Sequence, residues 1–381
     1  MLKKILNISL LITIVLNISG CSTIEQITEV TESQHANIEN SILLASNRLF
    51  EDLHENGQFV YIYYPTTQSY SNEYNIIRHI LASYTLIELY KYYDESKYLE
   101  GAEKSIEFFL QYINEEEETA YITYDEETKL GAAGTAILTL LNYEETTGST
   151  IYDNLIQKLA NFIMSMQKED GGYKNYYPEE KTDEPLSTVL YTGECNLALV
   201  RLYKKTGEAK YLTTVQKSYE WTKDYFANKH STGLVSWSSV ALAELYYITG
   251  EEKYSDLAYE MTDWLIDNTQ YTEETAPEEE YIGAFLINDI EGGLTCTVAA
   301  YGEGFNTMLK LAKYMKDKEH EEKYTDTLDK AIIFLLNMQF KDEDENATGG
   351  FIASFDNDKI RLDFTSHSLI TLIEYLNQIH D

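Results

Sequence analysis

The chain has 381 residues, a formal net charge of −35 and 44% hydrophobic residues, with 33 Tyr and only 3 Cys. Because phosphate contacts draw on a surplus of Lys and Arg, the excess of 64 Asp and Glu over 29 Lys and Arg excludes an ordinary nucleic-acid binder. The apolar and aromatic content excludes a disordered chain, and three cysteines cannot build a disulfide scaffold. The length suits one large domain or two ordinary ones.

The N-terminal residues have the features of a secretion signal. Lys3 and Lys4 precede an apolar run, 5–16, that is too short to span a membrane comfortably. The run ends in the letters ISGC at 18–21, which resemble the bacterial lipobox. That resemblance implies a signal peptide over 1–20, a lipidated Cys21, a polar tether over 21–35, and a protein anchored at the extracytoplasmic face of the cell membrane. A plain secretory signal with a chance Cys is the alternative.

Residues 36–381 carry a repeat that predicts helical hairpins. A Tyr near the start of one helix of each hairpin is followed ten residues later by an aromatic residue, in five pairs: Tyr98 and Phe108, Tyr152 and Phe162, Tyr211 and Trp221, Tyr254 and Trp264, Tyr324 and Phe334. Gly148, Gly207 and Gly250 lie between such helices, where Gly commonly ends the preceding one.

Apolar residues at helical spacing predict twelve helices, at 37–55, 75–92, 97–113, 131–146, 150–167, 190–205, 209–227, 236–248, 252–268, 299–315, 320–339 and 365–379. No alternating strand pattern is long enough to build a sheet, although short β pieces fit in the loops. Six hairpins predict an all-α (α/α)6 toroid, in which six inner helices ring an axis and the first helix is an outer one.

The connections between hairpins are long at 56–74, 114–130, 168–189, 269–298 and 340–364, and only the connection at 228–235 is short. The turns inside the hairpins are short. Long loops in a compact domain are usually functional. All of them gather on the face where the inner helices begin, and the positive ends of those helix dipoles favour anionic groups. We therefore expect the functional site on this face.

Aligning the inner helices on the tripeptides at 88–90, 201–203 and 244–246 brings six residues to one ring position: Leu81, Thr135, Glu194, Trp237, Glu303 and His367. We predict four acid/base candidates facing the axis: Glu194, Glu303, His367 and His79, the last lying two residues before Leu81. Trp237 and Tyr191 are candidate sugar-stacking residues. The alternatives are carboxylates that interact with a helix dipole, hydrogen-bonded core histidines and packing aromatics.

Two of the four arginines, Arg78 and Arg361, lie at the starts of inner helices that are neighbours in a closed ring. Arg binds carboxylates with paired hydrogen bonds, so these two predict an anionic sugar ligand such as a uronic acid, in an oligosaccharide or polysaccharide. A salt bridge with Asp363, itself a substrate-binding candidate, or with a local Glu is the alternative.

The remaining motifs are weaker and predict little about catalysis or ligand binding. The letters QKEDGGY at 167–173 resemble the repeat motif of terpene cyclases, and GGF at 349–351 is a similar turn; the resemblance implies a structural staple, and no cyclase-type acid cluster is present. No zinc or calcium spacing and no phosphate loop occurs, so we predict no metal and no cofactor. Cys195 and Cys296 both fall near the loop face, either as a pair or as separate buried thiols.

The hairpin pattern over 36–381, with turns such as TGEAKYL at 206–212 and TGEEKY at 249–254, resembles the six-hairpin glycosidase-like superfamily. That superfamily includes N-acylglucosamine 2-epimerases, unsaturated glucuronyl hydrolases, glucuronyl C5-epimerases and some polysaccharide lyases. The resemblance implies a toroid with an axial glycan-binding cleft, and the expected function is a hydrolase or epimerase of anionic glycans. A non-catalytic glycan-binding lipoprotein and a terpene-cyclase-like toroid are the alternatives.

Overall fold

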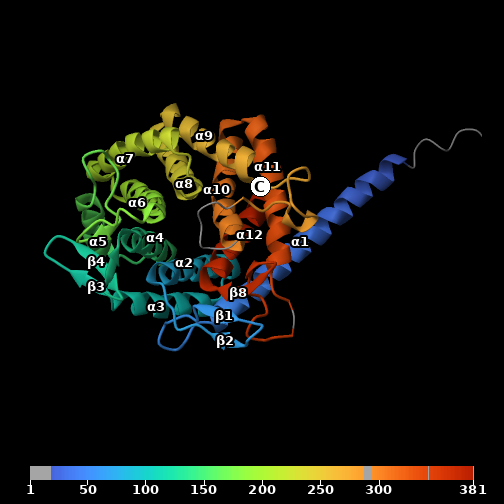
Figure 1. Cartoon of the computed structure of the whole chain (residues 1–381), viewed down its shortest axis with the longest axis horizontal. Helices are drawn as coiled ribbons and strands as arrows, with labels where there is room; N and C mark the ends of the chain where they lie inside the picture. The colour runs from blue at the N-terminus through green and yellow to red at the C-terminus, as the bar shows by residue number, and fades with distance from the viewer. Residues whose placement is uncertain (1–18, 287–293, 342, 381) are drawn as a thin grey trace, which may run out of the picture.

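The computed structural model describes residues 19–286, 294–341 and 343–380, and this part of the chain contains twelve α-helices (Figure 1). Their bounds are α1 Ser19–Glu51, α2 Ile76–Tyr93, α3 Ser96–Leu110, α4 Leu130–Thr147, α5 Asp153–Ser165, α6 Pro185–Thr206, α7 Ala209–Asn228, α8 Thr232–Thr249, α9 Glu252–Thr269, α10 Leu294–Met315, α11 Lys318–Met338 and α12 Leu362–His380. All twelve correspond to predicted helices. A short 3-10 helix, η1, covers Glu279–Tyr281.

The even-numbered helices form an inner ring, because each of them packs on the next and α12 packs on α2 (Figure 1). Helices α3, α5, α7, α9 and α11 pack outside their hairpin partners, and α1 completes the outer layer against α12. The predicted (α/α)6 toroid is confirmed, and so is the prediction that the first helix is an outer one.

The aromatic repeat accounts for the packing between the two layers. Tyr98, Tyr211, Tyr254 and Tyr324 are fully buried at the starts of outer helices. A Lys directly before three of these rings lies 4.7–4.8 Å from the ring centroid, at Lys97, Lys210 and Lys253. The preceding inner helices end at Gly148, Gly207 and Gly250 in the left-handed conformation, with φ near +70°, which L side chains rarely adopt. The short turns are thus specified by local sequence.

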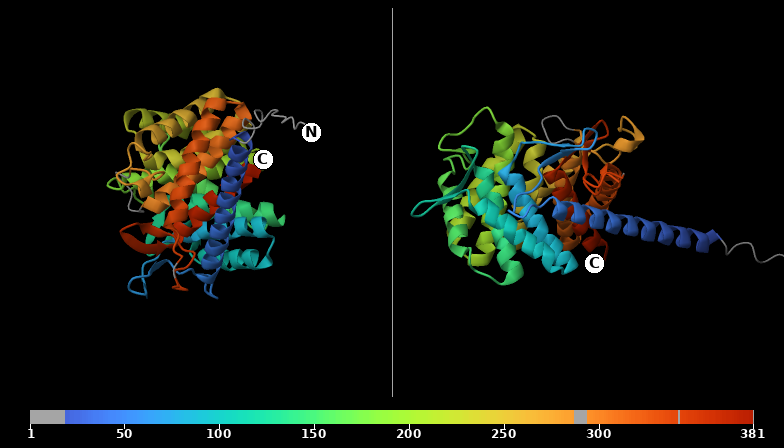
Figure 2. Two further views of the ribbon diagram at one scale, coloured as in Figure 1. Left: turned by 90° about the vertical axis from the view of Figure 1, so that its right-hand side faces the viewer. Right: turned by 90° about the horizontal axis from the view of Figure 1, so that it is seen from below.

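The N-terminal half of α1 extends beyond the body of the toroid (Figure 2). The helix begins at Ser19, so the predicted tether 21–35 is helical backbone continuous with the first outer helix. Residues 1–18 of the predicted signal peptide lie outside the described residues, and lipidation of Cys21 stays a prediction. Among the described helices, none combines the length and apolar character needed to cross a bilayer.

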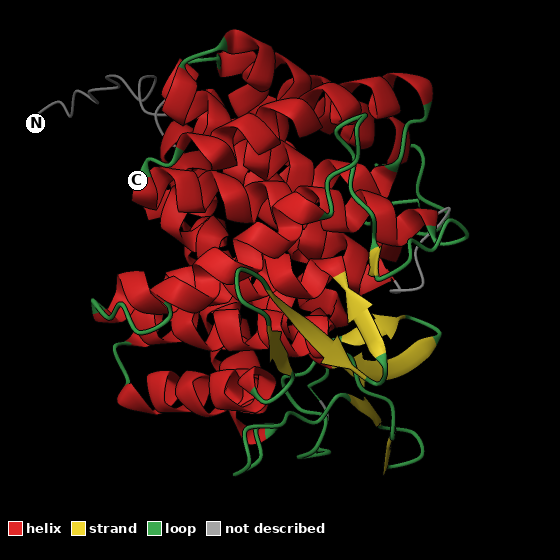
Figure 3. Cartoon of the chain, turned by 90° about the vertical axis from the view of Figure 1, so that its left-hand side faces the viewer, coloured by secondary structure: helices red, strands yellow, loops and turns green. Residues whose placement is uncertain are grey.

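Two small antiparallel sheets lie on the loop face, to one side of the helices (Figure 3). The first has the order β2-β1-β8-β7 and the second β3-β4-β5-β6, with bounds β1 Ile62–Tyr64, β2 Ser69–Tyr70, β3 Ile113–Glu115, β4 Ala120–Tyr124, β5 Glu127–Lys129, β6 Tyr176–Tyr177, β7 Ile352–Ser354 and β8 Asn357–Arg361. Ile62 pairs with Arg361, and Thr128 pairs with Tyr177. The sheets therefore join loops that are distant in sequence on the loop face of the toroid.

The segments that follow four outer helices are held by one repeated contact. In each, a Gly with positive φ lies so close to a backbone carbonyl of a neighbouring outer helix that a Cβ would approach the oxygen to 2.1–2.2 Å, at Gly57, Gly171, Gly283 and Gly349. An aromatic residue two positions later is fully buried in all four: Phe59, Tyr173, Phe285 and Phe351. The staple predicted at 167–173 and 349–351 is thus present and occurs twice more.

Candidate functional site

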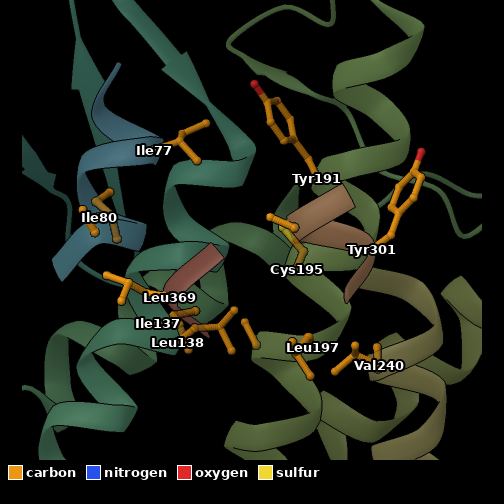
Figure 4. Packing of buried hydrophobic residues seen from close by; sticks show 14 of the residues in the cluster. Ile77, Ile80, Ile137, Leu138, Tyr191, Cys195, Leu197, Val240, Tyr301 and Leu369 are labelled. Atoms are coloured by element: carbon orange, nitrogen blue, oxygen red, sulfur yellow. The ribbon is translucent and has the colours of Figure 1, made fainter. Parts of the chain in front are cut away.

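An axial cavity of about 70 Å³ lies inside the ring and is lined by all six inner helices. Leu138, Leu197 and Val240 form an apolar wall from α4, α6 and α8, and Figure 4 shows these three side chains near one another. Charged and polar groups from α10 and α12 form the opposite wall, including Glu303 and His367. The cavity therefore presents an apolar surface and proton-exchanging groups to the same small volume.

Glu303 of α10 and His367 of α12 form an ion pair in this cavity. His367 Nδ1 lies 2.7 Å from Glu303 Oε1. Burial lowers the pKa of the imidazole, but the carboxylate of Glu303 opposes this and the net effect is a pKa above the ordinary value. A histidine held in this way can accept or release a proton near neutral pH.

Glu194 of α6 lies near this pair without lining the axial cavity, since the charge of His367 acts on its carboxyl. Its carboxyl is buried, and Oε2 has no hydrogen-bond partner among the described residues. Burial raises the pKa of this carboxyl to about 8, although the charges of His367 and Arg78 act in the opposite direction. Gly131 of α4 leaves the room for it, since a Cβ at Gly131 would lie 2.4 Å from Oε2. Glu194 is therefore protonated at neutral pH and can donate that proton.

Arg361 and Asp363 form a bidentate pair at the start of α12. Arg361 Nε donates to Oδ1 of Asp363 at 2.6 Å, and Nη2 donates to Oδ2 at 2.8 Å. The guanidinium of Arg361 is also buried against the ring of Phe364, 4.5 Å from its centroid. Two donors of Arg361 are engaged by Asp363, and binding of a ligand anion by Arg361 stays a prediction. The salt-bridge alternative is the one that the structure contains.

Asp363 also accepts from a second arginine. Arg78 Nε lies 2.8 Å from Asp363 Oδ2, and Arg78 Nη1 donates to the hydroxyl of Tyr61. Burial would raise the pKa of Asp363, but the two guanidinium charges hold it below the ordinary value. As a buried ion-pair partner, Asp363 positions both arginines instead of facing the axial cavity. Arg78 keeps 30% of its side chain exposed, and the cluster of two arginines and one carboxylate has an excess of one positive charge.

The two aromatic candidates lie on either side of Glu194. Trp237 of α8 lines the axial cavity, and Gly193 allows the close approach, because a Cβ there would lie 2.5 Å from Trp237 Cβ. Tyr191 is buried one turn before Glu194, and its ring packs over Gly131. Figure 4 shows the Tyr191 ring directed away from the apolar wall of the cavity. Trp237 is thus placed to contact a ligand, whereas Tyr191 covers Glu194.

His79 does not join the other candidates. Its Nδ1 lies 2.7 Å from the hydroxyl of Tyr74, and its Nε2 lies 2.8 Å from the backbone oxygen of Ser105 on α3. The ring packs against Phe108, and burial lowers the pKa of His79 to about 4. His79 is therefore a hydrogen-bonded residue between α2 and α3, which corrects its assignment as an acid/base candidate.

Cys195 and Cys296 are separate free thiols. Cys195 is buried, and the thiol of Cys296 donates to Oδ2 of Asp363 at 3.4 Å. In the described part of the chain, no group of three or more His, Cys, Asp or Glu side chains is arranged to hold a metal ion.

Aligning the inner helices of this chain with one another did not predict the residues that line the lower part of the axial cavity. Glu374, Arg201 and Tyr84 line it below the ring position. Oε2 of Glu374 is buried without a hydrogen-bond partner among the described residues, and burial raises the pKa of this carboxyl to about 7. Glu374 follows His367 by seven residues, two helical turns along one face of α12, and that spacing was the signal available in the sequence.

Comparison of the sequence with protein-family models and with curated proteins gives no match. Solved structures do match: a GH76 alpha-mannanase from Bacteroides thetaiotaomicron is 15% identical with a TM-score of 0.63, covering 91% of this chain and 97% of that one. A sugar epimerase from a ruminal bacterium is 14% identical with a TM-score of 0.65, covering 90% and 98%. The chain has the six-hairpin glycosidase fold.

An unsaturated glucuronyl hydrolase specific for heparin shares this six-hairpin fold, with 11% identity, a TM-score of 0.65 and coverage of 91% of this chain and 98% of that one. Identities this low establish the six-hairpin glycosidase fold and leave the reaction to be argued from the side chains. The resemblance of the hairpin pattern to this superfamily is confirmed at the level of architecture.

Proposed function

We propose that the chain is a membrane-anchored carbohydrate-active enzyme, a hydrolase or epimerase that acts on an anionic glycan by carboxylate and histidine acid-base catalysis. The observation that carries the proposal is the pairing of Glu303 with His367 in the axial cavity, with Glu194 buried close enough for the charge of His367 to act on its pKa. The similar structures include glycoside hydrolases and a sugar epimerase, which supports a carbohydrate ligand.

Hydrolysis needs an acid for the leaving group and a base for water. Glu194 holds its proton at neutral pH and gives it to the glycosidic oxygen as that bond breaks. Glu303, oriented by His367, accepts a proton from the water that adds to the anomeric carbon. Glu194 has then lost a proton to the leaving sugar, and Glu303 has gained one from water. Proton exchange with solvent returns both carboxyl groups to their starting protonation states.

Epimerisation is the second candidate, favoured by the presence of an imidazole inside the cavity. The Glu303–His367 pair would take a proton from a sugar carbon, and a second acid would return a proton to the opposite side of that carbon.

An anionic sugar is favoured by Arg78. Its side chain is partly exposed, and the cluster with Arg361 and Asp363 keeps one surplus positive charge. In a chain of net charge −35, such a local positive site is what an anionic ligand requires in order to bind. Trp237 supplies an aromatic surface at the cavity wall.

Anchoring through Cys21 is proposed from the sequence alone. A lipidated mature N-terminus at Cys21, seen by mass spectrometry, and release of the Cys21→Ala protein from the membrane fraction would support it. An unmodified Cys21 in the membrane fraction would refute it.

Product analysis tests the reaction. Uronic-acid oligosaccharides are screened by thermal shift, and each hit is incubated and analysed for cleavage or epimerisation. We expect turnover that Glu194→Gln, Glu303→Gln and His367→Ala each abolish; unchanged activity in these variants would refute the mechanism. A bound oligosaccharide recovered unaltered would instead favour the non-catalytic glycan-binding alternative. The terpene-cyclase-like alternative requires an apolar cavity, whereas this one carries Glu303, His367 and Glu374.

A further inference from the structure

A second and larger cavity opens on the face of the short turns, where the inner helices end. Its volume is about 690 Å³, and it is lined by the C-terminal halves of α2, α4, α6 and α8 together with the turn after α4. We call it the short-turn cavity. Tyr84, Leu138 and Arg201 line both this cavity and the axial cavity, so they form the partition between the two.

Three ion pairs line the short-turn cavity. Lys91 Nζ lies 2.9 Å from Glu88 Oε1, and Arg201 Nη2 lies 2.8 Å from Glu244 Oε1. Lys205 binds the buried carboxylate of Glu144. Within each pair the charges cancel, so these six side chains present polar groups without a net charge.

Two further charged residues complete the lining and differ from the rest. Lys204 and Glu145 both line the cavity, are exposed, and form no ion pair with any described residue. They balance each other formally, which leaves the cavity neutral within a chain of net charge −35. Their donor and acceptor atoms are available to a ligand, since no protein partner occupies them.

An exposed tyrosine shares a helix face with a residue that lines this cavity, and a second exposed tyrosine contacts it. Tyr247 follows the lining residue Glu244 by three residues on α8, which places both on one helix face. The ring centroids of Tyr247 and Tyr314 are 5.1 Å apart, and the two side chains are 41% and 66% exposed. A pair of solvent-facing aromatic rings next to a polar cavity is the combination that binds the apolar face and the hydroxyl groups of a sugar.

We propose that the short-turn cavity is a second saccharide-binding site that takes a neutral sugar residue. Neutrality follows from the lining, in which positively and negatively charged side chains are equal in number. Hydroxyl groups of the sugar exchange hydrogen bonds with Lys204 and Glu145, and Tyr247 stacks on the ring. This site lies across the partition from Glu303 and His367. Saccharide binding in it does not depend on the chemistry proposed for these two residues.

The test measures binding of three neutral trisaccharides, α-1,6-mannotriose, maltotriose and cellotriose, to the full-length protein by calorimetry and saturation-transfer NMR. We expect at least one to bind, and Tyr247→Ala to weaken that binding roughly tenfold. Lys204→Ala should weaken it less. Tyr70→Ala, which removes an exposed tyrosine from the loop face, is the matched control and should leave binding unchanged.

Trp237→Ala separates the two cavities. Binding that survives Trp237→Ala and fails in Tyr247→Ala places the neutral sugar in the short-turn cavity. Binding lost in Trp237→Ala but retained in Tyr247→Ala, or no binding of any of the three sugars, overturns the proposal. Turnover of an anionic glycan is measured separately with Glu303→Gln, so a failure of the proposed enzyme function is distinguishable from a failure of this site.

Discussion

The axial cavity and the short-turn cavity lie on one axis and differ in how they hold charge. Glu374 lines the axial cavity and Glu194 is buried near it. The Oε2 atoms of both carboxyl groups have no hydrogen-bond partner among the described residues, and burial raises the pKa of both. In the short-turn cavity, charges such as Lys91 and Glu88 are paired and partly exposed.

The difference between the cavities follows from depth. A buried carboxyl without a partner keeps its proton, because the charged form loses its hydration and gains nothing in return. An exposed pair stays ionised and exchanges hydrogen bonds with water. We therefore propose proton transfer at one level of the ring and reversible sugar binding at another.

The largest expected effect concerns turnover. Glu303→Gln removes the carboxylate that orients His367 and should lower kcat by at least about 100-fold, the lower range for loss of a general base. Tyr247→Ala, at the rim of the short-turn cavity, should leave kcat unchanged. The measurement is the rate on the anionic glycan identified by the screen, and equal losses in the two variants would remove the distinction between the cavities.

Stability should show the next largest contrast. Asp363→Ala leaves the guanidinium groups of Arg78 and Arg361 without their shared buried partner and should lower the free energy of unfolding by about 3–5 kcal/mol. Asp153→Ala breaks the exposed pair with Lys205 and should change it by less than about 1 kcal/mol. Urea unfolding of both variants measures this, and similar losses would contradict the assignment of Asp363 as a buried positioning residue.

The pH dependence of stability should be opposite in direction to that of an ion-paired carboxylate. The pKa of Glu194 is raised to about 8 in the folded state, so between about pH 4.5 and pH 8 the folded chain binds a proton that the unfolded chain has released. The contribution of Glu194 to stability is therefore full below this window and declines as pH rises through it.

Glu194→Gln keeps the shape of the side chain and removes this titration. Relative to wild type, the variant should be more stable at pH 8.5 than at pH 5, as measured by thermal or urea unfolding at both values. An identical pH profile for wild type and Glu194→Gln would contradict a protonated Glu194.

The smallest expected effect is steric. Gly131→Ala places a methyl group against Oε2 of Glu194 and the ring of Tyr191, in space that a Cβ cannot share without a shift. A cost of about 1–3 kcal/mol is expected for overpacking of this kind. The variant should also lose activity, because the shift moves the acid; full activity with unchanged stability would show that Glu194 has freedom to move.

The helices were predictable because their signals are local. Apolar spacing and the glycines at 148, 207 and 250 mark helix bodies and ends within a few residues. The strands were not predictable as sheets, because they have two to five residues and exist through pairing between distant loops, as between Ile62 and Arg361. Helix α6 begins at Pro185, five residues before the predicted start, where Pro suits the first turn.

Helical periodicity was enough to predict the part of the site that lies at one level of the inner ring. Glu194, Trp237, Glu303 and His367 share one level because every inner helix starts from the same face. His79 precedes the ring position of Leu81 by two residues, a rotation of roughly 200° about the helix axis, and so it faces α3. The commitment of Arg361 to Asp363 depends on side-chain geometry at the junction of β8 and α12, which spacing alone does not reveal.

Direct titration of Glu194 tests the central claim without any substrate. Carboxyl titrations are followed by infrared difference spectroscopy or by NMR of labelled Glu side chains, comparing wild type with Glu194→Gln. We expect a carboxyl that titrates near pH 8 and disappears in the variant. A Glu194 that titrates near its ordinary value of 4.5 would mean an ionised carboxylate at neutral pH, and the acid assigned to the axial cavity would be absent.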